Sequence, residues 1–242
     1  MAIEVVRKSL LAGAGEASGV VVIIDVFRAF SCAPILFWLG IKRLILEPNP
    51  ERALALKTGD DVILVGELDE RPIPGFDIGN SPSEIINRGR GFFQDKTVIQ
   101  RTTAGVQGVK AALQATNTVL LGSFVIARST ALFILHTIPP LYRVTLVAMG
   151  IRGKQPAPED EACADYLEHL VAAIPYEHLT AVERIVFHET AQKFLRGDRS
   201  YLPREDPIYC LQRNLFDFAL LAEEKSGLIE VSKIPVMVPA AL

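Results

Sequence analysis

The sequence predicts an α/β fold, layered α/β/α, around a largely parallel or mixed β-sheet. Short runs rich in Val, Ile and Leu recur along the chain, and each is followed by a turn and a helical pattern. Strands that alternate with helices are typical of this class. Half of the 242 residues are hydrophobic and only 7% are aromatic, which suits aliphatic packing of helices on a sheet. We expect a single domain over residues 1–242, with a division near residue 174 as the alternative.

Five strands and five helices are expected in the first 173 residues. The first strand, Val20–Ile24, is wholly apolar, as in a strand buried on both faces of a parallel sheet. The other four strands are expected at Asp61–Val65, Thr97–Gln100, Thr118–Leu121 and Val144–Ala148. The helices are expected at Ser31–Leu39, Ser81–Arg88, Val106–Ala115, Val125–His136 and Glu159–Ala173.

The chain after Ala173 has a different pattern. We expect helices near Ala181–Leu195 and Pro207–Glu224, then a final apolar strand near Leu228–Val238. The apolar end of the chain, Ile234–Leu242, could pack on a second subunit as readily as on its own sheet. A homodimer is therefore one of the two expectations for this segment.

Composition and charge exclude several classes of protein. The net charge is −3 and there is no basic run, so nucleic acid is not expected as a partner. The three cysteines are odd in number and form no CxxC pair, which indicates reduced, buried thiols in the cytoplasm. Charged residues Glu4, Arg7 and Lys8 argue against a signal peptide, and the apolar run Ala29–Ile41 is too short to cross a bilayer. We expect a soluble, cytoplasmic protein with no membrane partner.

Unusual polar residues follow the predicted strands. In open α/β sheets, ligands bind beyond the carboxyl ends of the strands. The residues in question are Asp25 and Arg28 after the first strand, Glu67 after the second, Arg101, Thr102 and Thr103 after the third, and Arg152, Glu159 and Asp160 after the fifth. If the strands are parallel, these side chains converge at one edge of the sheet.

Two of these positions carry acids that need an explanation. Asp25 directly follows a buried strand, where a purely structural acid would be poorly solvated, so we interpret it as a ligand or a nucleophile. Glu159, Asp160 and Glu161 are consecutive at a predicted helix start. The helix dipole alone can account for acids there, but three neighbouring carboxylates repel one another unless a cation is close. A divalent metal, which prefers carboxylate, water and phosphate oxygens, would relieve that repulsion.

Two helix starts are candidate anion sites. Ser81-Pro82-Ser83-Glu84 forms a capping box, which predicts a helix whose first amides face the edge of the sheet. The alternative is a well-capped helix and nothing more. The run from Arg101 to Gly105 offers a cation, two hydroxyls and a glycine at a helix start, although an ordinary first turn with threonine caps explains it equally well. A Walker A spacing and a GxGxxG motif are both absent, so a nucleotide cradle is not supported.

Taken together, these motifs resemble the 2-phosphosulfolactate phosphatase family. The matching pieces are Ile24–Ala29, Gly66–Glu84 with its specific GFDIGNSPSE string, Thr102–Gly105 and Glu159–Ala164, in the same order and spacing over roughly the first 170 residues. Family members often carry Thr-Thr-Asn-Gly-Thr where this chain has Ala104 and Val106 in place of the amide and the last hydroxyl. The stretch 149–153 is also poorer in Cys, Ala and Gly than is usual in the family.

The resemblance implies a layered α/β enzyme that uses Mg²⁺ to hydrolyse (2R)-O-phospho-3-sulfolactate to 3-sulfolactate and phosphate, a step of coenzyme M biosynthesis. Many bacteria without that pathway have similar proteins, so another small phosphorylated hydroxy acid is the open alternative. We expect the metal ligands to be Asp25, Glu67 and one or both of Glu159 and Asp160, with Asp25 as ligand or nucleophile. The residues expected to hold the substrate are Arg28, Asn80, Ser81, Arg101, Thr102, Thr103, Gly105 and, at a distal sulfonate or carboxylate, Arg152. Asp77 is the candidate general acid or its supporting partner.

Two rival interpretations come from other classes. A haloacid-dehalogenase-like phosphatase would need a second Asp two residues after Asp25, where this chain has Phe27. A non-catalytic α/β protein that keeps the anion pocket would explain Ala104. Phosphate release from phosphorylated three- and four-carbon acids in the presence of Mg²⁺ discriminates between the enzyme and the binding protein.

Overall fold

The structure is a computed structural model that describes residues 3–137 and 142–237. Its sheet has ten strands in the order β1-β8-β2-β7-β9-β10-β3-β6-β4-β5, and helices pack on both faces. This arrangement confirms the predicted α/β class with a mixed sheet. Within the described residues, every helix is too short or too polar to cross a membrane.

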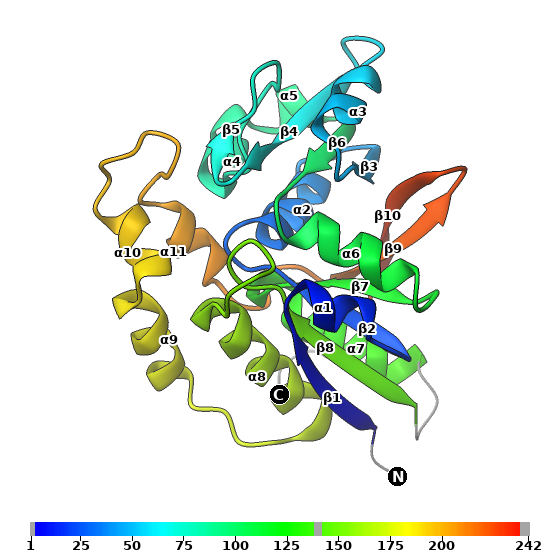
Figure 1. Ribbon diagram of the computed structural model, residues 1–242, viewed down its shortest axis with the longest axis vertical. Coiled ribbons are helices and arrows are strands. Elements are labelled where there is room, and N and C mark those ends of the chain that lie inside the picture. Colours follow the sequence, from blue (N-terminus) through cyan, green and yellow to red (C-terminus); the bar gives the residue numbers. More distant parts are fainter. Residues whose placement is uncertain (1–2, 138–141, 238–242) are drawn as a thin grey trace.

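The sheet consists of two parallel groups of strands separated by a hairpin (Figure 1). The first group contains β1 (Glu4–Ser9), β8 (Arg143–Ala148), β2 (Val20–Ile24) and β7 (Val119–Gly122). The second contains β3 (Arg43–Leu46), β6 (Thr97–Arg101) and β4 (Val62–Leu68), and short β5 (Arg71–Pro72) pairs antiparallel with β4. The hairpin is formed by β9 (Phe218–Lys225) and β10 (Leu228–Pro235).

The two groups run in opposite directions. The pairs β7–β9, β9–β10 and β10–β3 are all antiparallel, so three reversals separate β7 from β3. In Figure 1 the second group lies above the first, with the hairpin on the right. The carboxyl ends of both groups nevertheless meet, because the amide of Gly105, after β6, lies 2.8 Å from the carboxylate of Asp25, after β2. The loops after β2 and β6 therefore come together as predicted, although the strands do not all run in one direction.

Side chains of β2 show why this part of the sheet has helices on both faces. Val21 and Ile23 point into one hydrophobic core, while Val20, Val22 and Ile24 point into another. The first core is covered by α2 (Ala29–Trp38), α4 (Pro82–Arg88) and α6 (Gly105–Leu113). The second is covered by α7 (Ala127–Thr137), which follows a 3₁₀ turn at Phe124–Ile126, and by α8 (Pro158–Ala172) and α9 (His178–Phe187).

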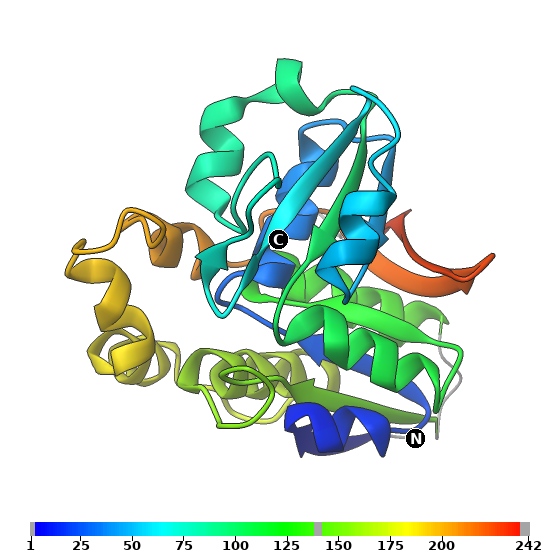
Figure 2. The same cartoon turned by 45° about the horizontal axis from the view of Figure 1, so that its top comes forward.

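The remaining helices are short. They are α1 (Leu10–Gly15), α3 (Pro50–Ala55), α5 (Arg90–Phe93), α10 (Glu189–Leu195) and α11 (Asp206–Cys210). In both views α9, α10 and α11 lie on the side of the molecule away from the hairpin (Figures 1 and 2). They flank the place where the carboxyl ends of the two strand groups meet.

The expected elements up to Ala173 are present, each within a few residues of its predicted bounds. The three cysteines are free and buried, as expected. The strands β1, β3 and β5 and the short helices α1, α3 and α5 were not predicted. The charged residues Glu4, Arg7 and Lys8 interrupt the apolar pattern of β1, and the other elements are too brief for a clear periodicity.

Two predictions in the last quarter of the chain need correction. The helix expected at Pro207–Glu224 is wrong, because α11 ends at Cys210 and the apolar run from Phe218 forms β9. Ser226 and Gly227, both with positive φ, form the two-residue turn of the hairpin, a signal that favours strands on either side. The segment Ala181–Leu195 is two helices rather than one, since His188 has extended backbone and caps α10. The last strand ends at Pro235, and its predicted end at Val238 lies outside the described residues.

Candidate active site

Two adjoining cavities lie where the carboxyl ends of the two strand groups meet. The smaller, of about 50 Å³, contains six acidic residues and is called the carboxylate pocket; they are Asp25, Glu67, Asp69, Glu70, Glu159 and Asp160. The larger, of about 850 Å³, lies between the segment 72–88 and the segment 200–209 and is called the chamber. Chemistry-bearing side chains from four strand ends therefore share one small space.

Asp25 lies at the base of the carboxylate pocket and is 7% exposed. Its Oδ2 accepts a hydrogen bond from the amide of Gly105 at 2.8 Å, and its Oδ1 accepts one from the amide of Ala29 at 3.3 Å. Gly105 is needed at this point, because a Cβ there would lie 2.7 Å from Asp25 Oδ2. Burial raises the pKa of Asp25 to about 7. The nearby charge of Glu67 adds to this rise, and the hydrogen bonds from the two amides oppose it.

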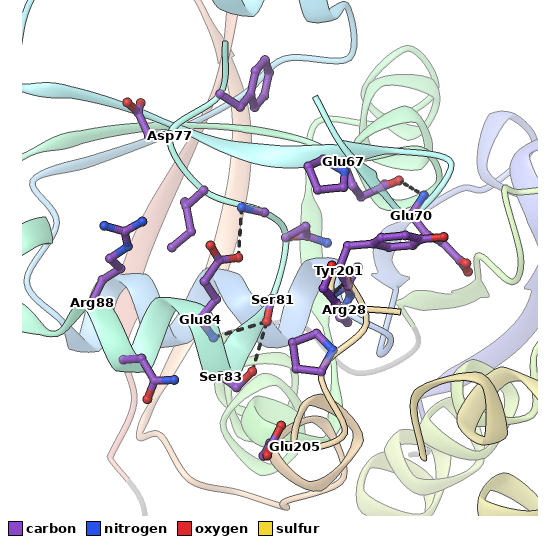
Figure 3. Close-up of a pocket in the computed structure, with 18 of the residues that line it drawn as sticks. Arg28, Glu67, Glu70, Asp77, Ser81, Ser83, Glu84, Arg88, Tyr201 and Glu205 are labelled. Carbon is purple, nitrogen blue, oxygen red and sulfur yellow. Dashed lines mark hydrogen bonds between the residues drawn. The ribbon is translucent and has the colours of Figure 1, made fainter. Parts of the chain in front are cut away.

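Glu67 faces Asp25 from the other strand group. Its Oε1 accepts from the amide of Thr103 at 2.6 Å, and its Oε2 accepts from the Thr103 hydroxyl at 2.9 Å and from the amide of Glu70 at 2.6 Å. The bond from Glu70 is drawn in Figure 3. Thr103 therefore lines the pocket, as predicted, but its amide and hydroxyl hold an acid of the protein.

Glu159 and Asp160 enter the pocket from the first turn of α8. Glu159 Oε2 accepts from the Thr190 hydroxyl on α10 at 2.8 Å. Asp160 accepts from two amides at 2.7 Å, those of Val26 and Gly150, and so joins the loops that follow β2 and β8. Burial raises the pKa of both acids, and for Asp160 the charges of Asp25 and Glu159 add to the effect. Both predicted acids reach the pocket, although Asp160 already has an amide on each oxygen.

Three cations also line the carboxylate pocket, and all three are paired. Arg152 Nε lies 3.0 Å from Asp69 Oδ1, and the Lys193 ammonium contacts Glu70. Arg28 Nη1 lies 2.8 Å from an oxygen of Asp206, with both side chains buried. Six acids against three bases leave the pocket with an excess of negative charge when all are ionised. That excess would repel a phosphate ester, and an added cation would reduce the repulsion.

The donor set fits a hard divalent cation. Among residues 3–137 and 142–237, no three side chains of the His, Cys, Asp and Glu types already surround one point as a metal site. Mg²⁺ does not require such a cage, since it is commonly held by one or two carboxylates together with waters and substrate phosphate oxygens. Asp25, Glu67 and Glu159 could supply those carboxylates, because each faces the same pocket and none of their charges is neutralised by an arginine or lysine contact in the described chain.

Both predicted anion sites at helix starts are occupied by acids of the protein. Gly105 at the start of α6 donates its amide to Asp25. At the start of α4, Asp206 accepts from the hydroxyls of Ser81 at 2.8 Å and Ser83 at 2.6 Å, and from the Ser83 amide at 3.1 Å. The expectation that Gly105 and Ser81 bind substrate phosphate is therefore corrected: these donors are already bonded to carboxylates.

Arg101 and Asp77 are two further corrections. Arg101 donates to the backbone carbonyls of Glu67 and Pro48, and it lines neither cavity. It supports the loop that carries Glu67 instead of contacting a substrate. Asp77 accepts from the amide of Leu64 at 2.8 Å and pairs with Lys57. Figure 3 places Asp77 at the far end of the chamber from Glu67, so it is not positioned as a general acid for the carboxylate pocket.

The remaining predicted residues do line the pocket. Asn80 lines both cavities, and its Oδ1 accepts from Gln100 at 3.0 Å, which leaves its amide nitrogen as the donor for a ligand. Thr102 lines the pocket while its hydroxyl accepts from the amide of Val106. Ala104 also lines it, whereas Val106 is buried in the hydrophobic core. Of the two replacements in the Thr102–Val106 turn, only Ala104 therefore changes the pocket, and the stretch 149–153, the other departure, reaches it through Gly150, Ile151 and Arg152.

Sequence reasoning missed the residues that α10 and α11 contribute. Lys193, Phe194 and Thr190 come from α10, and Asp206 begins α11. They follow no predicted strand and belong to no recognised motif. Charged residues are expected on the exposed face of any amphipathic helix, so the sequence does not indicate that these residues belong to a site. Their role depends on how these helices fold over the strand ends.

Comparison with known proteins identifies one family. Residues 6–225 match the family model described as 2-phosphosulpholactate phosphatase. A protein of Bacillus subtilis (strain 168) named probable 2-phosphosulfolactate phosphatase is 30% identical over 215 residues, which is 88% of this chain and 91% of that protein. Proteins with the same name are 27% identical over 90% of this chain in Clostridium perfringens (strain 13 / Type A), where 91% of the relative is covered, and 36% identical over 46% of both chains in Thermus thermophilus.

Proposed function

The chain belongs to the 2-phosphosulpholactate phosphatase family, and from that premise we propose that it is a magnesium-dependent phosphatase whose substrate is 2-phosphosulfolactate. The observation that carries the proposal is the carboxylate pocket. Acids from two separate strand ends and one helix gather there, and within the described residues no lysine or arginine forms an ion pair with Asp25, Glu67 or Glu159. Buried acids that raise each other's pKa are characteristic of functional sites.

Phosphate esters hydrolyse very slowly without catalysis, so the site must align a nucleophile and neutralise charge on the phosphoryl oxygens. We assign the metal to Asp25 and Glu67, with Glu159 as a third oxygen donor. Mg²⁺ bound there would act as a Lewis acid on the phosphoryl oxygens and lower the pKa of a bound water.

The protein's own donors would hold the anionic groups of the substrate. Lys193 and Arg152 are paired with Glu70 and Asp69 at the wall of the pocket, and each could exchange that partner for a phosphoryl or sulfonate oxygen. The amide nitrogen of Asn80, which also lines the pocket, would provide a neutral donor. We assign Asp160 the role of positioning the site, since its two hydrogen bonds to backbone amides join the loops that follow β2 and β8.

Asp25 is suited to either of two roles. Its Oδ2 is held by Gly105 at 2.8 Å, but the bond from Ala29 to Oδ1 is long at 3.3 Å, so Oδ1 is the freer oxygen. In the first role, that oxygen would bind the cation while water attacks phosphorus and the ester P–O bond breaks. In the second, the oxygen would itself bond to phosphorus as the ester P–O bond breaks and the alcohol leaves, and water would then hydrolyse the resulting acyl phosphate. Acid-quench trapping of radiolabelled protein during turnover separates the routes, since only the second leaves phosphate on the chain.

Phosphate release from 2-phosphosulfolactate tests the function directly. We expect release with Mg²⁺, loss of release with EDTA, and recovery when excess Mg²⁺ is restored. Titration calorimetry with Mg²⁺ alone should show binding that is absent in Asp25→Asn, which tests the metal site without relying on turnover. Activity that persists after chelation would exclude the metal scheme. No release from any phosphorylated three- or four-carbon acid would instead support the non-catalytic binding protein.

A further inference from the structure

Asn80 can offer either of two groups to the carboxylate pocket. It lines the pocket and is 3% exposed. The two ends of its side-chain amide have nearly the same shape, but the NH₂ group donates hydrogen bonds and the oxygen accepts them. An NH₂ group directed into the pocket would bind an anionic oxygen of a substrate, whereas the amide oxygen would repel it. The orientation of this one amide therefore affects what the pocket can bind.

Gln100, on β6, fixes the orientation of Asn80. Its side chain is wholly buried, and its Nε2 lies 3.0 Å from the carbonyl oxygen of Ala29 and 3.0 Å from Oδ1 of Asn80. A backbone carbonyl can only accept a hydrogen bond, so Gln100 must direct its NH₂ group, and not its oxygen, toward Ala29. The same NH₂ group contacts Asn80, which must then accept with its oxygen. The NH₂ group of Asn80 donates to no other group of residues 3–137 and 142–237 and is left for a ligand.

The oxygen of Gln100 indicates that packing alone does not explain this residue. Oε1 has no hydrogen-bond partner in the described part of the chain, although Gln100 is 0% exposed. A buried acceptor without a partner destabilises a fold, and an apolar side chain of similar length would fill the space without that penalty. Both hydrogen bonds of the side chain are made by its NH₂ group, one to the backbone and one to a residue of the pocket.

The three residues belong to different elements of the fold. Ala29 is the first residue of α2, Gln100 lies in the sheet between β3 and β4, and Asn80 directly precedes the N-cap residue of α4. The position of the Ala29 carbonyl is set by the helix, and the position of Gln100 is set by the sheet. The orientation of the Asn80 amide therefore follows from the backbone of two neighbouring elements.

We propose that Gln100 is a positioning residue for substrate binding: it holds the amide of Asn80 so that the NH₂ group donates to an anionic oxygen of the substrate. The inference rests on the proposed phosphatase function and adds to it a residue that does not touch the substrate. Gln100 is not among the described residues that line either cavity, so its effect on binding must pass through Asn80.

A double-mutant cycle tests the proposal, with Gln100→Met, Asn80→Ala and the double variant. Methionine is close to glutamine in length but has no donor. The KM for 2-phosphosulfolactate is measured with Mg²⁺, and calorimetry with Mg²⁺ gives the Kd values of inorganic phosphate and of 3-sulfolactate. The value of KM is informative because a purely structural defect would reduce the amount of folded protein, and hence the maximal rate, without changing KM.

We expect Asn80→Ala to raise KM about 10–100-fold, which is typical for loss of a hydrogen bond to a charged group. Gln100→Met should raise KM by about threefold or more and change kcat by less than about twofold, because an uncoupled Asn80 can turn its oxygen to the substrate. The double variant should match Asn80→Ala within about twofold, since Gln100 then has no amide to position. The ligand whose Kd rises in Asn80→Ala should be the one whose Kd rises in Gln100→Met.

Gln212→Met is the control, because the amide of this exposed residue also donates to a backbone carbonyl, that of Ile208 at 3.2 Å, and it lines neither cavity. Its KM should equal that of the wild type. Gln100→Leu is measured in parallel, so that the result does not depend on how well methionine packs. A wild-type KM in both Gln100 variants or in Asn80→Ala would overturn the inference, and so would effects that multiply in the double variant.

Failure of the proposed function gives a different result. If no phosphate is released from 2-phosphosulfolactate, the proposed function falls, and the Kd values of phosphate and 3-sulfolactate in the same four proteins still decide whether Gln100 acts through Asn80. If the wild type releases no phosphate and binds neither ligand, the proposed function and the inference fall together.

Discussion

The starts of α4 and α6 both hold a buried carboxylate of the protein, but the surroundings of the two acids are opposite. At α4, Asp206 accepts three hydrogen bonds from Ser81 and Ser83 and is paired with Arg28. At α6, Asp25 accepts from Gly105 and Ala29, and its charged neighbours Glu67 and Glu159 are also acidic. The charge of Asp206 is compensated by groups of the protein, whereas the charge of Asp25 is not.

This difference separates a structural acid from a functional one. Burying a charge is costly, and the cost is met when a counter-ion and hydrogen bonds satisfy it, as at Asp206. Where like charges are brought together instead, the protein retains an unfavourable arrangement that an added cation would relieve. The comparison predicts that substitution of Asp25 chiefly affects activity, while substitution of Asp206 chiefly affects stability.

The largest effect is expected for Asp25→Asn. Removing this carboxylate takes away the central metal ligand or nucleophile, so kcat/KM should fall at least about 10⁴-fold, or about 5.5 kcal/mol. Its free energy of unfolding should fall less than that of Asp206→Asn, because relief of repulsion offsets the loss of a hydrogen-bond acceptor. Phosphate-release kinetics and urea unfolding measure the two quantities. Asp61→Asn, at an exposed position before β4, is the control and should keep full activity.

Full activity in Asp25→Asn would show that Asp25, like Asp206, has a structural role and no catalytic one. The same conclusion would follow if the substitution lowered stability as much as activity.

Asp206→Asn should produce the opposite profile. The change leaves Arg28 buried without a counter-ion, and breaking such a pair costs about 3–5 kcal/mol. The free energy of unfolding from urea titration measures this loss. Asp165→Asn is the matched control, since Asp165 pairs with Arg7 at the surface and such pairs contribute at most about 1 kcal/mol. Equal effects of the two substitutions would mean that the Arg28–Asp206 pair does not stabilise the fold.

Four of the six acids of the carboxylate pocket were predictable because their signal is local. Asp25 follows a strand that is apolar throughout, and Glu159 and Asp160 share the first turn of a helix with a third acid. The partners of the two helix starts were not predictable in the same way. Asp206 is 125 residues away from Ser81, and nothing near either residue identifies the other. A capping box predicts a helix and its orientation, but the group that binds to its amides depends on the tertiary fold.

The hairpin β9–β10 illustrates a second limit. The run Phe218–Ala222 is apolar at every position, so its periodicity fits a buried helix as well as a buried strand. Placement of this run between β7 and β3 also reverses the direction of one strand group relative to the other. The polar residues nevertheless gather where they were predicted to, because both groups of strands have their carboxyl ends at the same site.

The pH dependence of stability should report the uncompensated acids. Burial raises the pKa of Asp25 to about 7, and it also raises the pKa values of Glu159 and Asp160. Between the unfolded pKa of about 4 and the folded pKa, the folded state keeps protons that the unfolded state has released. In the metal-free protein, the contribution of Asp25 to stability should therefore fall by about 2–4 kcal/mol as pH rises from 4 to 7, and level off above that.

Urea unfolding in EDTA at several pH values measures this profile, and the difference between wild type and Asp25→Asn isolates the contribution of Asp25. Mg²⁺ should stabilise the wild type more at pH 8 than at pH 5, since protonated acids do not bind the ion. A profile that rises with pH in the same window, or a Mg²⁺ effect independent of pH, would contradict the interpretation of Asp25 as an uncompensated acid.

The smallest effect is expected for Gly105→Ala, which tests whether α6 itself holds Asp25 in place. The new Cβ would lie 2.7 Å from Asp25 Oδ2 and 3.0 Å from a ring carbon of Phe30, so the carboxylate or the helix start must shift. We expect a loss of stability of about 1–3 kcal/mol and a fall in kcat/KM of about 10–100-fold. Gly91→Ala on α5 is the control, because a Cβ there meets nothing within 4 Å and alanine favours the helix. Identical behaviour of the two alanine variants would mean that close approach of Asp25 to the start of α6 is not what positions this carboxylate.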